Sequence, residues 1–213
     1  HDQPRVRCRA VLDVHDPRLR HLKCNCEHVA TSFELLLQHA VVCPNSGYSL
    51  VNRHDDVKHA LARVARDFGI GVTVEPREFQ YRPNIIPDAA GNAVAEQAVA
   101  QRPDLRFNCI MQHVVTDVVI SKHTDVPGVA AERAFREKNA THAETVSAHG
   151  ALFFPFAAEP HGFRHPCCKQ LFKHIADQLT PFERRYFWRQ AELAVSIAQA
   201  KSRVHAVLAV VNS

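Results

Sequence analysis

Two aspartates flank a pair of short apolar segments in the second half of the chain. Asp104 follows Arg102-Pro103 and precedes the first segment, and Asp117 lies thirteen positions later, in the second. A β-hairpin formed by these segments would return Asp117 to the side of Asp104. Two converging carboxylates can bind Mg²⁺ or Mn²⁺ through oxygen, and such a cation can activate water for attack on a phosphate. The spacing is therefore compatible with a metal site that acts on a phosphate.

A lysine beside these acids would stabilise the negative charge that develops on a reacting phosphate. Lys138 lies in a helical stretch with Phe135 at i−3 and His142 at i+4, so we expect it to point toward the sheet. Lys122 is closer in sequence to the second aspartate and is the alternative. Glu75, at the end of a predicted strand, is a candidate for an additional metal ligand.

A cluster of cysteines and histidines lies nearer the N-terminus. Cys24 and Cys26 are followed by His39 and Cys43. Four such ligands can form a tetrahedral site for a structural Zn²⁺, whose binding would help residues 21–52 to fold. The seven cysteines are an odd number, and no secretory signal pattern opens the chain, which favours reduced thiols over disulfides. The rival ligands are His28 and Cys8.

Two basic features could contact nucleic acid. Residues 1–20 form an arginine-rich arm that can hold a phosphate backbone or remain a solvated tail. Arg53 and His54 lie at the predicted start of a helix, where free backbone amides also bind phosphate. The chain has 26 basic and 22 acidic residues, and this net charge of +4 permits a polyanionic partner without requiring one.

The elements that must position these residues follow from the pattern of apolar residues. The chain has 213 residues, 46% of them apolar, which is enough for one globular domain, and no run is long enough to span a membrane. The order of elements predicts an α/β fold with a mixed sheet flanked by helices. We expect helices at 53–68, 129–149, 165–179 and 181–202, and strands at 71–75, 105–110, 114–121 and 151–158.

The succession of these motifs resembles the restriction-like endonuclease domain of site-specific non-LTR retrotransposons. The Cys-Cys-His-Cys cluster comes first, followed by Arg53-His54-Asp55, by Arg102-Pro103-Asp104 with Asp117, and by a helix with Glu137-Lys138. The apolar segment 150–156 comes last. The resemblance covers roughly residues 20–165. It implies a PD-(D/E)XK nuclease core, preceded by a zinc knuckle.

The resemblance assigns Asp104 and Asp117 as the metal-binding acids. Val119 stands where the lysine of the pattern normally lies, which points to Lys138 on the following helix, and His142 replaces an aromatic residue that is usually tyrosine. Asn84, in a second Arg-Pro-x motif, is the rival for the position of Asp104.

The function implied by this resemblance is metal-dependent nicking of a target DNA. The domains would be a basic arm (1–20), a zinc knuckle (21–52) and the nuclease domain (53–213). The cofactors would be catalytic Mg²⁺ or Mn²⁺ and structural Zn²⁺. The partners would be target DNA and element RNA, with no membrane, inside a nuclear polyprotein that carries a reverse transcriptase. The alternatives are a nucleic-acid-binding module that has lost its catalytic site, and a zinc-stabilised protein-interaction domain.

Overall fold

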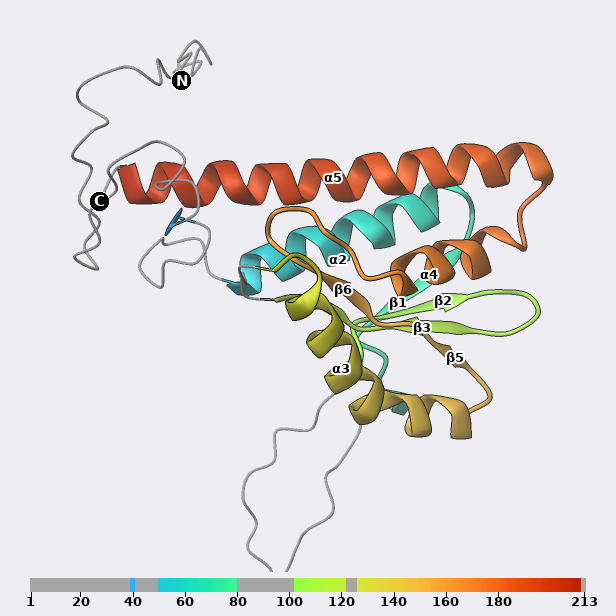
Figure 1. The fold of residues 1–213 in the computed structure, drawn as a ribbon. Helices are drawn as coiled ribbons and strands as arrows, with labels where there is room; N and C mark the ends of the chain where they lie inside the picture. The colour runs from blue at the N-terminus through green and yellow to red at the C-terminus, as the bar shows by residue number, and fades with distance from the viewer. Residues whose placement is uncertain (1–38, 41–49, 80–101, 122–125, 212–213) are drawn as a thin grey trace, which may run out of the picture. The chain divides into compact units, whose positions relative to one another are not determined.

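A computed structural model describes residues 39–40, 50–79, 102–121 and 126–211, with side chains up to residue 207 (Figure 1). Residues 49–202 form one structural unit, and residues 1–48 with 203–213 form another. The described residues of the predicted catalytic and DNA-binding sites belong to the first unit. Its helices and strands form a mixed α/β architecture, as the sequence predicts.

Helix α2 (Leu50–Asp67) carries the predicted apolar stripe. It begins at Leu50, three residues earlier than expected. Gly69, just beyond its end, has a φ of 75°, a conformation that favours glycine. Across this turn the Ile70 amide donates to the Ala65 carbonyl at 3.0 Å. The buried side chains of the stripe are Val57, Leu61, Val64 and Ala65.

The sheet contains an antiparallel part and a parallel part. Its larger portion has the order β1-β2-β3-β5, with antiparallel pairs β1–β2 and β2–β3 and a parallel pair β3–β5. Strands β4 and β6 form a second parallel pair. The bounds are Gly71–Val74 (β1), Leu105–Asn108 (β2), Val114–Thr116 (β3), Val118–Ile120 (β4), Leu152–Phe153 (β5) and Phe156–Ala158 (β6).

The strands predicted at 114–121 and 151–158 are each split in two. The first is interrupted at Asp117 and the second between β5 and β6, where Pro155 has no amide to donate. The register nevertheless continues, because Val114 pairs with Leu152 and Val118 pairs with Phe156 at the same offset. Each split is therefore a local interruption of one parallel ladder.

The segment 151–158, which is strongly apolar and predicted as a strand, lies only partly in the interior of the sheet. Within the part of the sheet that the structure describes, β5 is an edge strand. Phe156 is fully buried, whereas Phe153 and Phe154 are half-buried. Contacts with helices α3 (Val129–Ala148) and α4 (Cys167–Ala176) cover the segment instead of a further strand.

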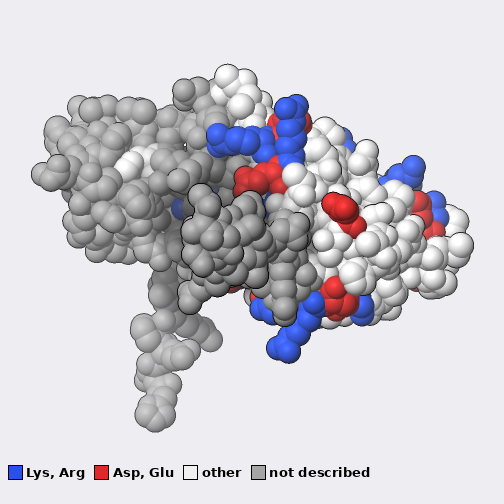
Figure 2. Space-filling view, turned by 90° about the horizontal axis from the view of Figure 1, so that it is seen from below, with Lys and Arg blue, Asp and Glu red and all other residues white. Residues whose placement is uncertain are grey.

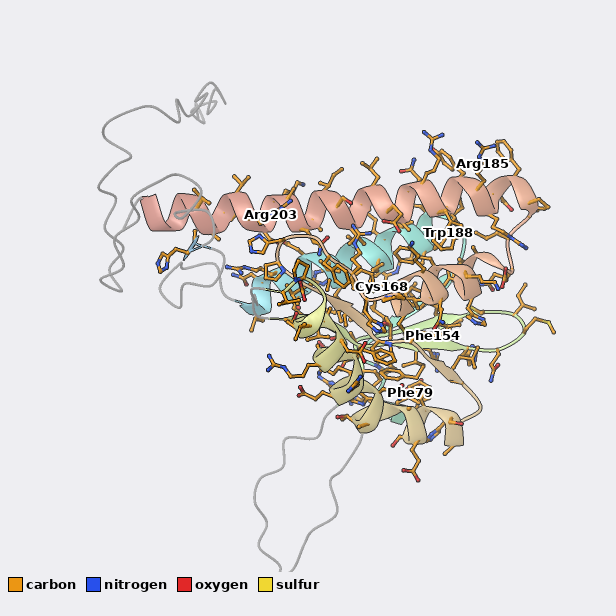
Figure 3. The ribbon with its side chains drawn as sticks, in the orientation of Figure 1. Phe79, Phe154, Cys168, Arg185, Trp188 and Arg203 are labelled. Atoms are coloured by element: carbon orange, nitrogen blue, oxygen red, sulfur yellow. The ribbon has the colours of Figure 1, made fainter. Side chains whose placement is uncertain are left out.

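Helices cover both faces of the sheet (Figure 1). Helices α2, α4 and α5 (Pro181–Val211) lie on one side, where Phe107, Phe156 and Phe172 belong to the main core. Trp188 of α5 points toward α4, whereas Arg185 points away from it (Figure 3). Helix α3 lies on the other side, over a smaller core that includes Phe79, Val115, Val146 and Ala151. Phe79 ends the short 3₁₀ helix η2 (Arg77–Phe79).

The start of α5 agrees with the predicted break at Thr180-Pro181. The Thr180 amide donates to the Glu183 carboxylate at 3.0 Å, and the Glu183 amide donates to the Thr180 hydroxyl at 3.4 Å. This reciprocal pair is a capping box. The helix continues to Val211, nine residues beyond the predicted end. None of the helices in the described ranges combines the length and apolar character needed to cross a membrane.

Candidate active site

Asp104 and Asp117 stand at the same end of the β2–β3 hairpin. Asp104 immediately precedes β2, whose first residue Leu105 pairs with Thr116, and Asp117 directly follows Thr116. Both side chains are nearly enclosed, with 10% and 6% of their surface exposed. One ligand atom from each aspartate and one from His54 lie within 4.8 Å of one another. The hairpin thus brings together the two acids that the sequence singles out.

Asp117 faces helix α3 because side chains alternate along a strand. Val115, two residues earlier, packs in the core on the α3 side of the sheet. From α3, Lys138 Nζ lies 2.8 Å and His142 Nε2 lies 3.1 Å from Asp117 Oδ2. Lys138 and His142 are four residues apart and therefore share one face of the helix. His142 is almost fully buried, where its ring also packs edge-on against Phe153.

His54, on helix α2, contacts Asp104. Its Nε2 lies 2.8 Å from Asp104 Oδ2, and the same oxygen accepts a hydrogen bond of 2.7 Å from the Val118 backbone amide. Its Nδ1 lies 3.1 Å from Asp55 Oδ1. Burial lowers the pKa of His54, but Asp104 and Asp55 raise it more, so the pKa lies above its ordinary value.

The environments of the two acids move their pKa values in opposite directions. Burial raises the pKa of Asp104, and the neighbouring Asp117 raises it further, against the opposing effect of His54. Burial also raises the pKa of Asp117, but His142, Asp104 and Lys138 lower it more, to about 2. Asp117 is therefore the acid that remains ionised, while Asp104 holds a proton more readily. Such divergence within an adjacent pair is typical of catalytic sites.

Glu75 lies beside Asp104 but is engaged with basic residues. Its amide donates to the Asp104 carbonyl at 2.7 Å, and its φ of 50° is a strained conformation for a residue other than glycine. Its carboxylate pairs with Arg102 and lies 3.5 Å from Lys58 Nζ. Lys58 also lies 2.8 Å from Asp55. Glu75 is absent from the group of converging ligand atoms found among the described residues.

These side chains border an open pocket of about 540 Å³. Both aspartates, His54, Lys58 and Lys138 line it, together with Glu75, Asp55 and apolar residues from α2 and β4. The pocket thus combines acids, bases and apolar walls around the point where Asp104 and Asp117 converge. Because the pocket is open to solvent, a substrate can reach the carboxylates of Asp104 and Asp117.

The structure bears on most of the residues to which the sequence assigns a role. It gathers Asp104, Asp117 and Lys138, and it adds His54, which was expected to contact DNA. Arg53, also expected to contact DNA, is only 4% exposed, so a phosphate would reach its guanidinium only after the covering residues move. Of the four predicted zinc ligands, His39 is described, as a half-buried helical residue, and Cys24, Cys26 and Cys43 lie outside the described ranges. The rival positions Lys122 and Asn84 also lie outside them.

Two site residues were not identified from the sequence. Asp55 pairs both with the imidazole of His54 and with Lys58, which is almost enclosed. The signal was present, because Lys58 lies four residues after His54 and three after Asp55, on one face of a helix. The sequence alone does not show which face of α2 packs against the sheet. In the structure, α2 packs against β4 and β1.

The donor set fits a divalent cation. Ligands that share one ion at 2.0–2.6 Å can lie at most about 4–5 Å apart, which the observed separation satisfies. Asp117 Oδ2 is buried and accepts no hydrogen bond of regular geometry from the described residues, although Lys138 Nζ and His142 Nε2 lie 2.8 and 3.1 Å away. Two carboxylates and one imidazole are suitable ligands for a metal ion. His54, Asp104 and Asp117 are the residues that would hold it.

Charges on the visible surface do not form a broad basic face. Figure 2 shows acidic and basic side chains of the described residues in neighbouring clusters, with neutral residues between them. This mixture agrees with the small net charge. Attraction of a polyanion to this face would therefore depend on local groups and not on one broad basic surface.

No family model and no curated protein sequence matches this chain. The class to which the protein belongs therefore has to be inferred from its residues and their arrangement.

Proposed function

We propose that this chain is a metal-dependent nuclease domain that hydrolyses phosphodiester bonds of DNA. The observation that carries the proposal is the convergence of Asp104 and Asp117, with Lys138 beside Asp117 in an open pocket. Paired carboxylates with an adjacent cation suit phosphoryl chemistry, where charge develops on non-bridging oxygens. The opposite pKa shifts of the two acids at one pocket are also typical of catalytic sites.

Asp104, Asp117 and His54 would hold Mg²⁺ or Mn²⁺. When bound, such a cation polarises a phosphoryl oxygen and makes water a stronger nucleophile at neutral pH. The chain itself supplies the remaining requirements. The low pKa of Asp117 keeps it ionised at neutral pH, and the Val118 amide fixes the orientation of Asp104.

Lys138 supplies positive charge next to the reacting phosphate. Its ammonium lies at Asp117 while 27% of its side chain remains exposed, so it can also contact a substrate in the pocket. A fixed cation of this kind lowers the energy of a transition state that carries extra negative charge. The hydrolysis releases one strand end with a hydroxyl and one with a phosphate.

We extend the proposal to a restriction-like core with an N-terminal zinc knuckle, acting in a retrotransposon polyprotein in the nucleus. The order of the motifs supports this extension. The position of Lys138 on α3, beside Asp117, supports it as well, because Val119 stands where the lysine of the family pattern normally lies. In that setting, nicking of the target DNA would expose a 3′-hydroxyl that primes reverse transcription. Cys24, Cys26, His39 and Cys43 remain the proposed zinc ligands.

The direct test is nicking of supercoiled plasmid by the purified chain, with Mg²⁺, with Mn²⁺ and with excess chelator. We expect conversion to the open circular form only with a divalent cation. End labelling should find a 3′-hydroxyl and a 5′-phosphate at the nick. Plasmid binding without cleavage under every metal condition would contradict the nuclease proposal and favour the binding module.

A further inference from the structure

Both ring nitrogens of His54 are engaged by carboxylates. Nε2 lies 2.8 Å from Asp104 Oδ2, on the side where the two acids converge, and Nδ1 lies 3.1 Å from Asp55 Oδ1. A histidine that binds a metal typically presents one nitrogen to the ion and donates a hydrogen bond from the other to a carboxylate. Asp55 already occupies the position of that acceptor. The ring is thus oriented with Nε2 toward the aspartates.

Asp55 is itself held in place. Lys58 Nζ lies 2.8 Å from Asp55 Oδ1 and 3.5 Å from Glu75 Oε1, and only 8% of its side chain is exposed. His54, Asp55 and Lys58 come from consecutive turns of one helix, so their relative positions are fixed by α2. A preorganised imidazole of this kind binds a cation without losing much conformational entropy.

The geometry points to His54 Nε2 as the third protein ligand of the metal site, with Asp55 as its positioning residue, and to a preference of the site for Mn²⁺ over Mg²⁺. This inference rests on the metal site of the proposed function. Imidazole nitrogen binds first-row transition metals well, whereas Mg²⁺ strongly prefers oxygen and keeps its water. One nitrogen among two carboxylates therefore shifts the preference toward Mn²⁺.

Glu75, which the sequence suggested as the additional ligand, would have made a site of oxygen ligands alone. Its carboxylate pairs with Arg102 and lies near Lys58, so binding a metal would require breaking the pair with Arg102. His54 Nε2 already lies within the group of converging ligand atoms, and metal binding there would replace only its hydrogen bond to Asp104, itself a proposed ligand. The third metal ligand would therefore be the Nε2 nitrogen of His54 and not an oxygen of Glu75.

The test measures metal binding in the full chain, without DNA. Calorimetric titration with Mn²⁺ and with Mg²⁺ should give a dissociation constant at least about tenfold lower for Mn²⁺. His54→Gln should weaken Mn²⁺ binding about 10–100-fold, the range found for the loss of groups that support a metal site, while changing Mg²⁺ binding less. His59→Gln, at an exposed position of the same helix, is the matched control and should leave both affinities unchanged.

Pulsed electron paramagnetic resonance of bound Mn²⁺ gives a second readout. Coupling to an imidazole ¹⁴N nucleus should be present in the unaltered chain and in His59→Gln, and absent in His54→Gln. For the positioning role, Asp55→Ala should weaken Mn²⁺ binding, and Asp55→Asn, which keeps an oxygen acceptor, should restore most of it. Circular dichroism and thermal melting identify any variant that is unfolded.

The outcomes separate this inference from the function on which it rests. If both cations bind with equal affinity, or if His54→Gln keeps the ¹⁴N coupling, the inference is wrong, but the acid pair can still hold the metal of a nuclease. If neither cation binds, both the inference and the metal-dependent nuclease are wrong. If His54→Gln weakens the binding of Mn²⁺ more than that of Mg²⁺, and His59→Gln changes neither affinity, the inference is supported.

Discussion

The Val118 backbone amide donates a hydrogen bond of 2.7 Å to the carboxylate of Asp104, fourteen residues earlier in the chain. Val118 begins β4 directly after Asp117, at the point where the parallel ladder is interrupted. Thr116, two residues earlier, accepts a hydrogen bond from the Asp104 amide, so the Val118 amide faces the same side, toward β2, and its bond holds one acid against the strand that carries the other. This contact is therefore part of the arrangement that brings the two carboxylates together.

Glu159 should stabilise the start of the helix that carries Lys138. Its buried Oε1 accepts hydrogen bonds of 2.9–3.2 Å from the amides of Gly128, Ala130 and Ala131. We expect Glu159→Ala to lower the free energy of unfolding by about 2–3 kcal/mol, because these amides lose a charged acceptor. Urea denaturation measures the change. Glu144→Ala, at an exposed position of α3, should cost much less, and equal costs would argue against the cap.

Removal of Lys138 should slow cleavage without preventing metal binding. We expect Lys138→Ala to lower the rate of plasmid nicking by about 10²-fold or more, because the site loses a preorganised cation. The affinity for Mn²⁺ should be equal or higher, since an ammonium no longer competes at Asp117. Lys169→Ala, at an exposed position of α4, is the control. An unchanged rate in Lys138→Ala would show that Lys138 is not catalytic.

The capping box of α5 predicts a pH dependence of stability. Bonds from the Thr180 hydroxyl and amide lower the pKa of Glu183 below its ordinary value of 4.5. A lowered folded-state pKa gives stability that is present above pH 4.5 and is lost as the pH falls through the folded-state pKa. Thr180→Val should therefore destabilise the chain more at pH 7 than at pH 3.5. Chemical denaturation at both pH values checks this, and a pH-independent cost would contradict it.

Zinc analysis tests the predicted zinc site, three of whose four ligands lie outside the described residues. Protein purified without added zinc should contain about one Zn²⁺ per chain, bound by three thiolates and one imidazole. Cys24→Ser and Cys43→Ser should each lose it, because the remaining ligands cannot complete a tetrahedral site. Cys109→Ala should keep the zinc, because the Cys109 thiol forms no disulfide and is buried in the unit of residues 49–202. Metal-free protein, or zinc retained in both serine variants, would exclude this ligand set.

Much of the arrangement was accessible from the sequence because it depends on local patterns. The spacing of Asp104 and Asp117 fits a hairpin, and the helical position of Lys138 relative to Phe135 placed it toward the sheet. The capping residues around Thr180 also follow from short-range chemistry. Each of these predictions uses residues that are close in sequence or related by one turn.

The remainder depends on tertiary packing, which local patterns do not contain. His54 was expected to contact DNA because it lies near a helix start, but the packing of α2 against β4 directs it toward Asp104. Glu75 was expected to bind metal, but two basic residues from different elements engage it. The interruption of the strand at Asp117 was also not foreseen, because the apolar pattern of 114–120 continues on either side of the acid.

Asp117→Asn provides the most direct test of the proposed function. Asparagine keeps the shape of the side chain but removes the charge that would hold the cation and pair with Lys138. The measurement is Mn²⁺-dependent nicking of supercoiled plasmid, with DNA affinity determined in parallel by fluorescence anisotropy. Asp67→Asn, which alters an exposed aspartate at the end of α2, is the matched control.

We predict that the unaltered chain and Asp67→Asn nick the plasmid at equal rates. Asp117→Asn should be slower by about 10³-fold, because it loses a ligand of the activating metal. Its DNA affinity should change by less than about threefold, because basic side chains supply most non-specific affinity. Nicking by Asp117→Asn at the rate of the unaltered chain would contradict the proposed active site.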